Sequence, residues 1–230
     1  RVSYDEMKAE FKRILTKKGF EEQEAEEAAI IFVENSCDGV YSHGVNRFPR
    51  VVEYIDKGYI KPDATLEKIG GFGAIEQWDG NLGMGNLNAK KSMERATQLA
   101  EEHGIGCVVL KNTNHWMRGG AYGWQAAKAG FIGICWTNTI PNMPAWGAED
   151  RRIGNNPLIM AVPRVDGPIV VDMAMSQFSY GKIEEYKLNG TQLPVAGGYD
   201  TNGDISTDPK EILERLLSIF ECAIPCDLRL

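Results

Sequence analysis

The stretch AIEQWDGNLGMGNLNAKKSMERATQLAEEHGIGCVVL, residues 74–110, decides the fold class of this 230-residue chain. Short apolar runs at Ala74–Trp78 and Gly106–Leu110 predict two strands. The segment between them, Leu87–Glu102, predicts a helix. Strands that alternate with helices indicate an α/β fold.

The glycines between the first strand and the helix do not complete a dinucleotide-binding fingerprint. Residues Gly80–Gly85 read GNLGMG, whereas a Rossmann fold needs Gly-x-Gly-x-x-Gly between a buried strand and a helix. A tight turn explains these glycines better. We therefore expect a mixed α/β fold that is not of the Rossmann type.

The chain before this stretch reads as a small helical unit, residues 1–60. Ser3 followed by Glu6 is a capping box, which predicts a helix start. Apolar residues at helical spacing predict three helices, which run from Ser3 to Gly19, from Glu21 to Cys37 and from Arg47 to Ile55.

Residues 61–214 are expected to form a mixed α/β unit that holds cofactor and substrate. Its further predicted elements are strands at Ile132–Trp136, Leu158–Val162 and Ile169–Met173 and a helix at Gly120–Ala129. Gly197–Pro209 is rich in turn residues and predicts an exposed loop.

Composition narrows the function classes. The net charge is −7, so we expect no nucleic-acid partner and no anionic membrane surface. No signal segment or long apolar run is visible, and we expect a cytoplasmic protein. Of the five cysteines, Cys37, Cys107 and Cys135 lie in or beside apolar runs and should be reduced, buried thiols. Cys222 and Cys226, with no histidine or further cysteine near them, do not make a zinc site. We expect no metal.

Two of the three histidines are candidates for chemistry. His103 ends a predicted helix, where the helix dipole gives it a structural role. His43 lies between two helices, with Arg47 one helical turn further on. An imidazole that donates a proton beside a guanidinium that binds a carboxylate is what the reduction of a 2-keto acid requires. A helix-capping role for His43 explains the local sequence equally well.

His115 follows the predicted strand Gly106–Leu110 in a polar segment, KNTNHWMRGGAYGW. Ligands bind at strand ends in α/β proteins, and paired glycines let the backbone approach a ligand closely. Asn114 and Arg118 accompany the histidine, so a packing role would leave many polar groups to satisfy. A functional role for His115 is favoured.

Several longer segments carry a family resemblance. They are VYSHGVNRFPR, GAIEQWDG, HGIG, NHWMRGGAYGWQAA, GFIGICWTNT, RIGNNPLI, VVDMAMSQFSYG and QLPVAGGYD. Together and in this order they resemble the malate/L-lactate dehydrogenase family. The resemblance implies the non-Rossmann fold of that family, a homodimer, and a nicotinamide-dependent reductase of an open-chain keto sugar acid.

The same resemblance implies roles for single residues. His43 matches the catalytic histidine, Arg47 the ligand of the substrate carboxylate, and His115 a second pocket histidine; family members divide the acid role between the two histidines differently. Asn114 and Arg118, with Asn46 and Thr137, are candidates for binding substrate hydroxyls.

Cofactor contacts are also implied by resemblance. The cofactor is expected to be NAD, as NADH rather than NADPH. The matching positions are Thr139, Pro168, Ile169, Val170, Val171, Asp172, Met173 and Ala174. Asp172 ends a predicted strand, where a carboxylate could bind ribose hydroxyls or could cap the next turn.

The resemblance ends at about residue 214. The tail, residues 215–230, reads RLLSIFECAIPCDLRL and suggests an altered end that lacks cofactor-binding segments of the family. Two hypotheses therefore stand. One is a working reductase, of a keto sugar acid or of a malate- or lactate-type 2-keto acid. The other is an inactive relative that only binds a ligand or self-associates.

Overall fold

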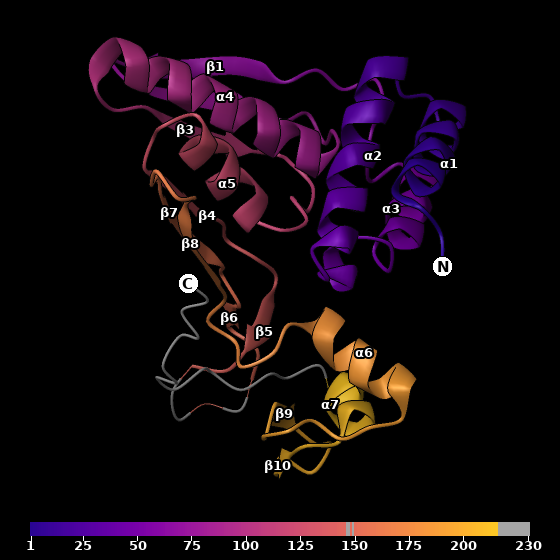
Figure 1. Cartoon of the computed structure of the whole chain (residues 1–230). Helices are drawn as coiled ribbons and strands as arrows, with labels where there is room; N and C mark the ends of the chain where they lie inside the picture. Colours follow the sequence, from indigo (N-terminus) through magenta and orange to yellow (C-terminus); the bar gives the residue numbers. More distant parts are fainter. Residues whose placement is uncertain (146–147, 149, 216–230) are drawn as a thin grey trace. The chain divides into compact units, whose positions relative to one another are not determined.

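The computed structural model describes residues 1–145, 148 and 150–215 (Figure 1). It divides into two compact units. The first holds Arg1–Gly133 and Ala161–Pro168, and the second holds Ile134–Met160 and the chain from Ile169 onward. Within the described residues, no helix combines the length and the apolar character needed to cross a membrane.

The first unit begins with the predicted helices. They are α1 (Tyr4–Lys17), α2 (Glu22–Cys37) and α3 (Phe48–Asp56), with a short 3-10 helix, η1 (Tyr41–His43), before α3. The capping box is confirmed: the Ser3 side chain accepts a hydrogen bond from the Glu6 amide, and the Glu6 carboxylate accepts one from the Ser3 amide. Pro49 occupies the first turn of α3, where its missing N–H leaves no helical bond unmade.

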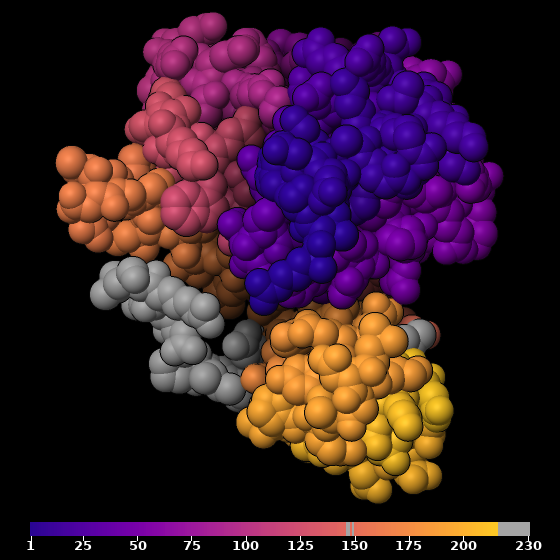
Figure 2. Space-filling view, turned by 45° about the vertical axis from the view of Figure 1, so that its right-hand side comes forward, coloured from indigo at the N-terminus to yellow at the C-terminus, as the bar shows by residue number. Residues whose placement is uncertain are grey.

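Three phenylalanines join these helices. Phe11 and Phe48 stack with ring centroids 3.8 Å apart, and Phe32 meets both rings edge-on. Figure 1 shows the three helices in indigo and violet, and Figure 2 shows the same colours on the space-filling surface of this part of the chain. The same buried cluster includes Met84, Leu87 and Met117. One apolar core therefore joins the three helices to later segments of the first unit.

The stretch 74–110 forms the predicted strand, helix and strand. These are β2 (Ile75–Asp79), α4 (Gly85–His103) and β3 (Cys107–Lys111), with β2 and β3 parallel. A strand that the sequence did not predict, β1 (Glu67–Phe72), pairs antiparallel with β2. Its two consecutive glycines and its exposed side chains hid it from a hydrophobic pattern. α5 (Gly120–Lys128) follows, as predicted.

A buried ion cluster links this sheet to α4. The Glu76 side chain is 3% exposed, and its carboxylate accepts two hydrogen bonds from Arg95, one from Lys68 and one from the Trp78 indole. The Arg95 hydrogen bonds are the largest cause that lowers the pKa of Glu76, to about 2, against the effect of burial. Glu76 is therefore ionised at neutral pH and stays so well below the usual pKa of a glutamate.

The remaining strands and helices are short. β4 (Gly133–Trp136), β7 (Leu158–Val162) and β8 (Ile169–Met173) form a sheet in the order β4-β7-β8, on the predicted residues. The elements that were not predicted are β5 (Pro141–Met143), β6 (Ile153–Gly154), α6 (Tyr180–Asn189), β9 (Gly198–Tyr199), β10 (Ile205–Ser206) and α7 (Pro209–Arg215). β9 and β10 pair as a hairpin inside the predicted loop.

Three cysteines lie within the described residues, and all three are free thiols. Cys135 is buried as expected, and burial raises the pKa of its thiol to about 12. Cys37 is exposed, which corrects the expectation that it is buried, because it is the last residue of α2 and lies beyond the packed face. Cys222 and Cys226 lie outside the described residues.

Candidate active site

Two histidines from distant parts of the sequence meet in the first unit. The ring centroids of His43 and His115 are 5.6 Å apart, with an angle of 32° between the ring planes. His43 is the last residue of η1, and His115 lies in the loop between β3 and α5. The sequence suggested both residues separately, and the structure brings them together.

The turn that carries His43 is fixed by α2. The side-chain amide of Asn35 donates to the His43 carbonyl at 3.1 Å, and the Ser36 hydroxyl accepts from the Val45 amide at 2.9 Å. A Cβ at Gly44 would lie 2.2 Å from the Ser36 oxygen, so only glycine fits there. These contacts fix the backbone of the turn and therefore the position of the His43 imidazole.

The loop that carries His115 is fixed by a neighbouring turn. The Asn114 side-chain amide donates to the carbonyls of Tyr59, Leu82 and Gly83 at 3.0, 2.9 and 3.1 Å. The loop backbone also passes so close to α4 that a Cβ at Gly85 would lie 2.1 Å from the Asn114 carbonyl. This close approach explains one glycine of GNLGMG without a phosphate-binding role.

Both imidazoles have a strongly lowered pKa. Desolvation lowers the pKa of His43 to about 4, and the positive charges of Arg47 and Arg118 add to the effect. Desolvation also lowers the pKa of His115 to about 3, followed by the charges of His43 and Arg47. His115 nonetheless keeps solvent-exposed surface. Both rings are neutral at neutral pH.

Two guanidinium groups flank the histidines. Arg47 lies immediately before α3, and its Nε donates to the Ser42 carbonyl at 3.3 Å. Arg118 forms an ion pair with Asp38, with Nη1 and Oδ2 2.5 Å apart. The site therefore sets two guanidinium groups, one of them paired with a carboxylate, beside two neutral imidazoles, and guanidinium groups are suited to bind carboxylates.

All the expected cofactor residues except Pro168 belong to the second unit. The Thr139 hydroxyl donates to Asn155 Oδ1 at 2.7 Å and accepts from the Asn156 amide at 3.2 Å, so it orders its own loop. Asp172 lies near the end of β8 and is exposed, as is Met173. An exposed carboxylate beside exposed apolar surface at a strand end fits a ribose and a nicotinamide ring.

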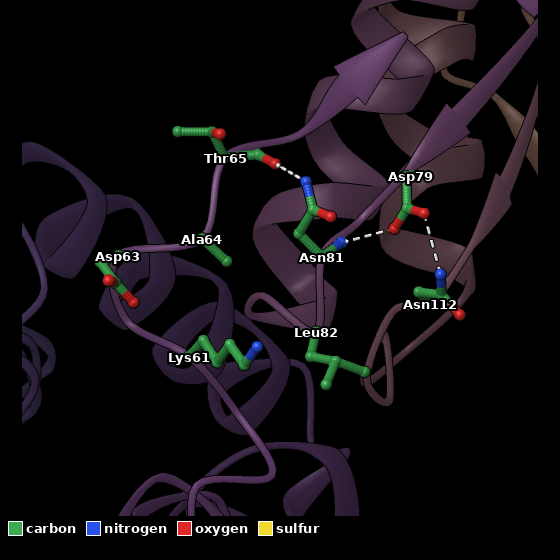
Figure 3. A pocket seen from close by; sticks show the side chains of 8 residues that line it. All are labelled: Lys61, Asp63, Ala64, Thr65, Asp79, Asn81, Leu82 and Asn112. Atoms are coloured by element: carbon green, nitrogen blue, oxygen red, sulfur yellow. Dashed lines mark hydrogen bonds between the residues drawn. The ribbon is translucent and has the colours of Figure 1, made fainter. Parts of the chain in front are cut away.

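A separate open pocket of about 580 Å³ lies in the first unit (Figure 3). It is lined by Lys61, Asp63, Ala64, Thr65, Asp79, Asn81, Leu82 and Asn112. The Asp79 carboxylate accepts from the Asn81 amide and the Asn112 side chain, as Figure 3 shows. None of the predicted site residues lines it. In the described part of the chain, no group of three His, Cys, Asp or Glu is placed to bind a metal.

Comparison with known proteins decides the family. The family model for malate/L-lactate dehydrogenase matches residues 2–223. The chain belongs to the malate/L-lactate dehydrogenase family. The match extends past the residue where the sequence resemblance was expected to end.

Curated relatives in this family include 2,3-diketo-L-gulonate reductases from Salmonella paratyphi B and Escherichia coli. Each is 54% identical to this chain over 210 residues, which are 91% of this chain and 63% of the relative. The chain thus spans less than two thirds of the length of these relatives.

Solved structures agree on the fold. Malate dehydrogenase from Entamoeba histolytica has a TM-score of 0.89 at 32% identity, over 94% of this chain and 60% of its own. Sulfolactate dehydrogenase from Methanocaldococcus jannaschii has a TM-score of 0.84 at 32% identity, over 93% and 62%. The expected non-Rossmann fold of the malate/L-lactate dehydrogenase family is confirmed.

One predicted site residue, Asn114, also holds its own loop. Its side-chain amide nitrogen donates to three backbone carbonyls, and its expected binding of substrate hydroxyls stays a prediction. Asn46, the other asparagine proposed for hydroxyls, is exposed, and Thr137 lies in the second unit.

Sequence reasoning also missed partners of the site. Asp38 binds Arg118, the Ser42 hydroxyl lies 3.0 Å from His43 Nδ1, and the Met117 amide donates to His115 Nδ1 at 2.9 Å. Ser42 directly precedes His43, and this adjacency was the one available signal.

Proposed function

We propose that this chain is a nicotinamide-dependent reductase of an open-chain keto sugar acid, with 2,3-diketo-L-gulonate as substrate and 3-keto-L-gulonate as product. The observation that carries the proposal is the pair His43 and His115, 5.6 Å apart and flanked by Arg47 and Arg118. The curated relatives named 2,3-diketo-L-gulonate reductase support the choice of substrate. NADH as the preferred cofactor and a homodimer are parts of the same proposal.

The chemistry assigns a task to each group. A reduced nicotinamide supplies a hydride to the carbonyl carbon when it is bound. The ketone oxygen then needs a proton, which His43 donates, while the Arg47 guanidinium binds the substrate carboxylate. In the second unit, Asp172 would bind the cofactor ribose.

Substrate binding also prepares the acid. The positive charges of Arg47 and Arg118 contribute to the low pKa of His43. A bound carboxylate offsets these charges, and this favours the protonated imidazole. We therefore expect the pKa of His43 to rise, with uptake of a proton, when an anionic substrate binds.

The test is NADH oxidation followed by absorbance, with 2,3-diketo-L-gulonate compared with oxaloacetate and pyruvate. We expect His43→Ala to lower kcat by about 100-fold or more, whereas Arg47→Ala chiefly raises KM. His103→Ala is the matched control, because His103 is exposed at the end of α4 and pairs with Glu102.

Unchanged kcat in His43→Ala would remove the acid role from this residue. Faster reduction of oxaloacetate or pyruvate would replace the sugar acid with a malate- or lactate-type substrate. No turnover, together with no NADH binding in a titration, would refute the reductase and leave an inactive ligand-binding or self-associating protein.

A further inference from the structure

The two histidines of the pair have different hydrogen-bond partners on Nδ1. The partner of His43 is the Ser42 hydroxyl, at 3.0 Å. A hydroxyl can either donate or accept, so His43 can gain or lose a proton and keep this bond. The partner of His115 is the Met117 backbone N–H, at 2.9 Å, which can only donate.

We propose that the Met117 amide holds His115 as a neutral imidazole with its proton on Nε2, so that His43 alone donates the proton to the substrate. In this arrangement His115 donates a hydrogen bond from Nε2 to the ketone oxygen without giving up its proton. Protonation of His115 on Nδ1 would set two N–H groups against each other and lose a hydrogen bond. The catalytic part of this inference rests on the proposed reductase function.

The peptide group that makes this contact is fixed at both ends. Its N–H is that of Met117, and its carbonyl is that of Trp116, which accepts from the Tyr122 hydroxyl at 2.5 Å. Tyr122 is buried on α5, with its ring centroid 5.8 Å from that of Trp116. A flip of this peptide would break both bonds, so the group cannot readily present its carbonyl to His115 instead.

The backbone of Met117 is itself unusual. Its φ is +68°, a left-handed conformation that non-glycine residues rarely adopt because it is strained. The side chain is 2% exposed and belongs to the core cluster of the N-terminal helices. Burial of this side chain therefore stabilises a strained residue whose amide points at the histidine. We regard Met117 as a positioning residue.

The charges around the two histidines also disfavour a protonated His115. The groups that act on His115 are His43 and Arg47, and both oppose a positive charge on its ring. Arg118 acts on His43, and the carboxylate of Asp38 is bound to Arg118. These charges add to the hydrogen-bond argument, which stands on geometry alone.

The direct test is NMR of the full chain labelled with nitrogen-15 in histidine. The sequence has three histidines, so the variants His43→Gln and His103→Gln assign every signal. We expect the nitrogen shifts of His115 to report the Nε2–H tautomer, and we expect His43 to become protonated first as the pH falls. An Nδ1–H tautomer on His115, or protonation of His115 before His43, overturns the proposal.

Tyr122→Phe tests the clamp on the peptide. Loss of the hydroxyl frees the Trp116 carbonyl, and we expect His115 to show a mixture of tautomers. Tyr59→Phe is the matched control, because the Tyr59 ring is largely exposed, and it should leave the His115 signals unchanged. An unchanged His115 signal in Tyr122→Phe would show that Tyr122 does not hold the peptide between Trp116 and Met117, and would contradict a fixed peptide.

Turnover separates the two histidine roles. A glutamine side chain can donate a hydrogen bond but cannot deliver a proton at neutral pH. We expect the kcat of His115→Gln to be higher than that of His115→Ala by about 10-fold or more, whereas the kcat of His43→Gln should be no higher than that of His43→Ala. Rescue by glutamine at His43 and not at His115 would reverse the assignment. An absence of turnover in the wild type would refute the reductase function, while the NMR result would still decide the tautomer.

Discussion

Replacement of Asn114 distinguishes an anchor of the active-site loop from a ligand of the substrate. Its side-chain amide has two N–H groups, which serve three backbone carbonyls at 2.9–3.1 Å. Each hydrogen bond contributes about 0.5–1.5 kcal/mol, so two give about 1–3 kcal/mol. Because the residue is half-exposed, we expect Asn114→Ala to lower the free energy of unfolding by about 1–2 kcal/mol.

Asn114→Asp should be more harmful than Asn114→Ala. The aspartate places carboxylate oxygens against three carbonyl oxygens, so it loses the hydrogen bonds and adds repulsion. A substrate-binding role alone would predict no loss of stability from either change.

The assay is urea denaturation followed by tryptophan fluorescence. With a slope of about 2–3 kcal/mol per molar urea, Asn114→Ala should shift the midpoint down by about 0.5 M. Asn46→Ala is the matched control, because Asn46 is an exposed asparagine on the neighbouring turn, and its midpoint should not move. An unchanged midpoint in both Asn114 variants would refute the anchoring role.

Changes at Gly44, Glu76 and His43 should also alter stability. Gly44→Ala places a Cβ 2.2 Å from the Ser36 oxygen and should destabilise the chain by about 1–3 kcal/mol. Gly70→Ala is the control, because its Cβ meets only a flexible side chain at 3.3 Å. Equal urea midpoints for the two variants would contradict this. The pKa of Glu76 is lowered to about 2, so its contribution to the free energy of unfolding is present above its unfolded pKa and is lost as the pH falls toward 2. Glu76→Gln should therefore reduce the loss of stability on acidification. An unchanged dependence of stability on acidic pH would contradict this. The pKa of His43 is lowered to about 4, so between about pH 6.5 and 4 the unfolded chain binds more protons and the free energy of unfolding decreases as the pH is lowered. His43→Gln should reduce the slope of the free energy of unfolding against pH by the equivalent of about one proton. An unaltered slope would exclude the lowered pKa.

Local sequence signals were reliable where the physics is local. The capping box at Ser3 and Glu6, and the helical spacing in α1, α2 and α4, depend on residues close in sequence. β1 was missed because its glycines and exposed side chains carry no apolar pattern, and it is held by pairing with β2. The composition around β9 and β10 predicts a loop, because two-residue strands are defined by their partner rather than by composition.

The site was predictable in its residue types but not in its arrangement. His43, Arg47 and His115 were selected from their chemistry and from the family resemblance, which no geometry had informed. Asn114 was selected in the same way, yet its amide group is used on the carbonyls of Tyr59, Leu82 and Gly83, far away in sequence. Which polar side chain faces a ligand and which one holds a loop depends on those distant carbonyls.

The sequence by itself determined helices α1 to α5, the main strands, the family and the two imidazoles with their guanidinium neighbour. Capping, hydrophobic spacing and functional-group chemistry depend on the residues themselves. Only the tertiary structure decided that His43 faces a hydroxyl while His115 faces an amide of a strained residue. The physical reason is that a proton's position depends on the hydrogen-bond partner, and that partner is placed by the buried Met117 and Tyr122 side chains.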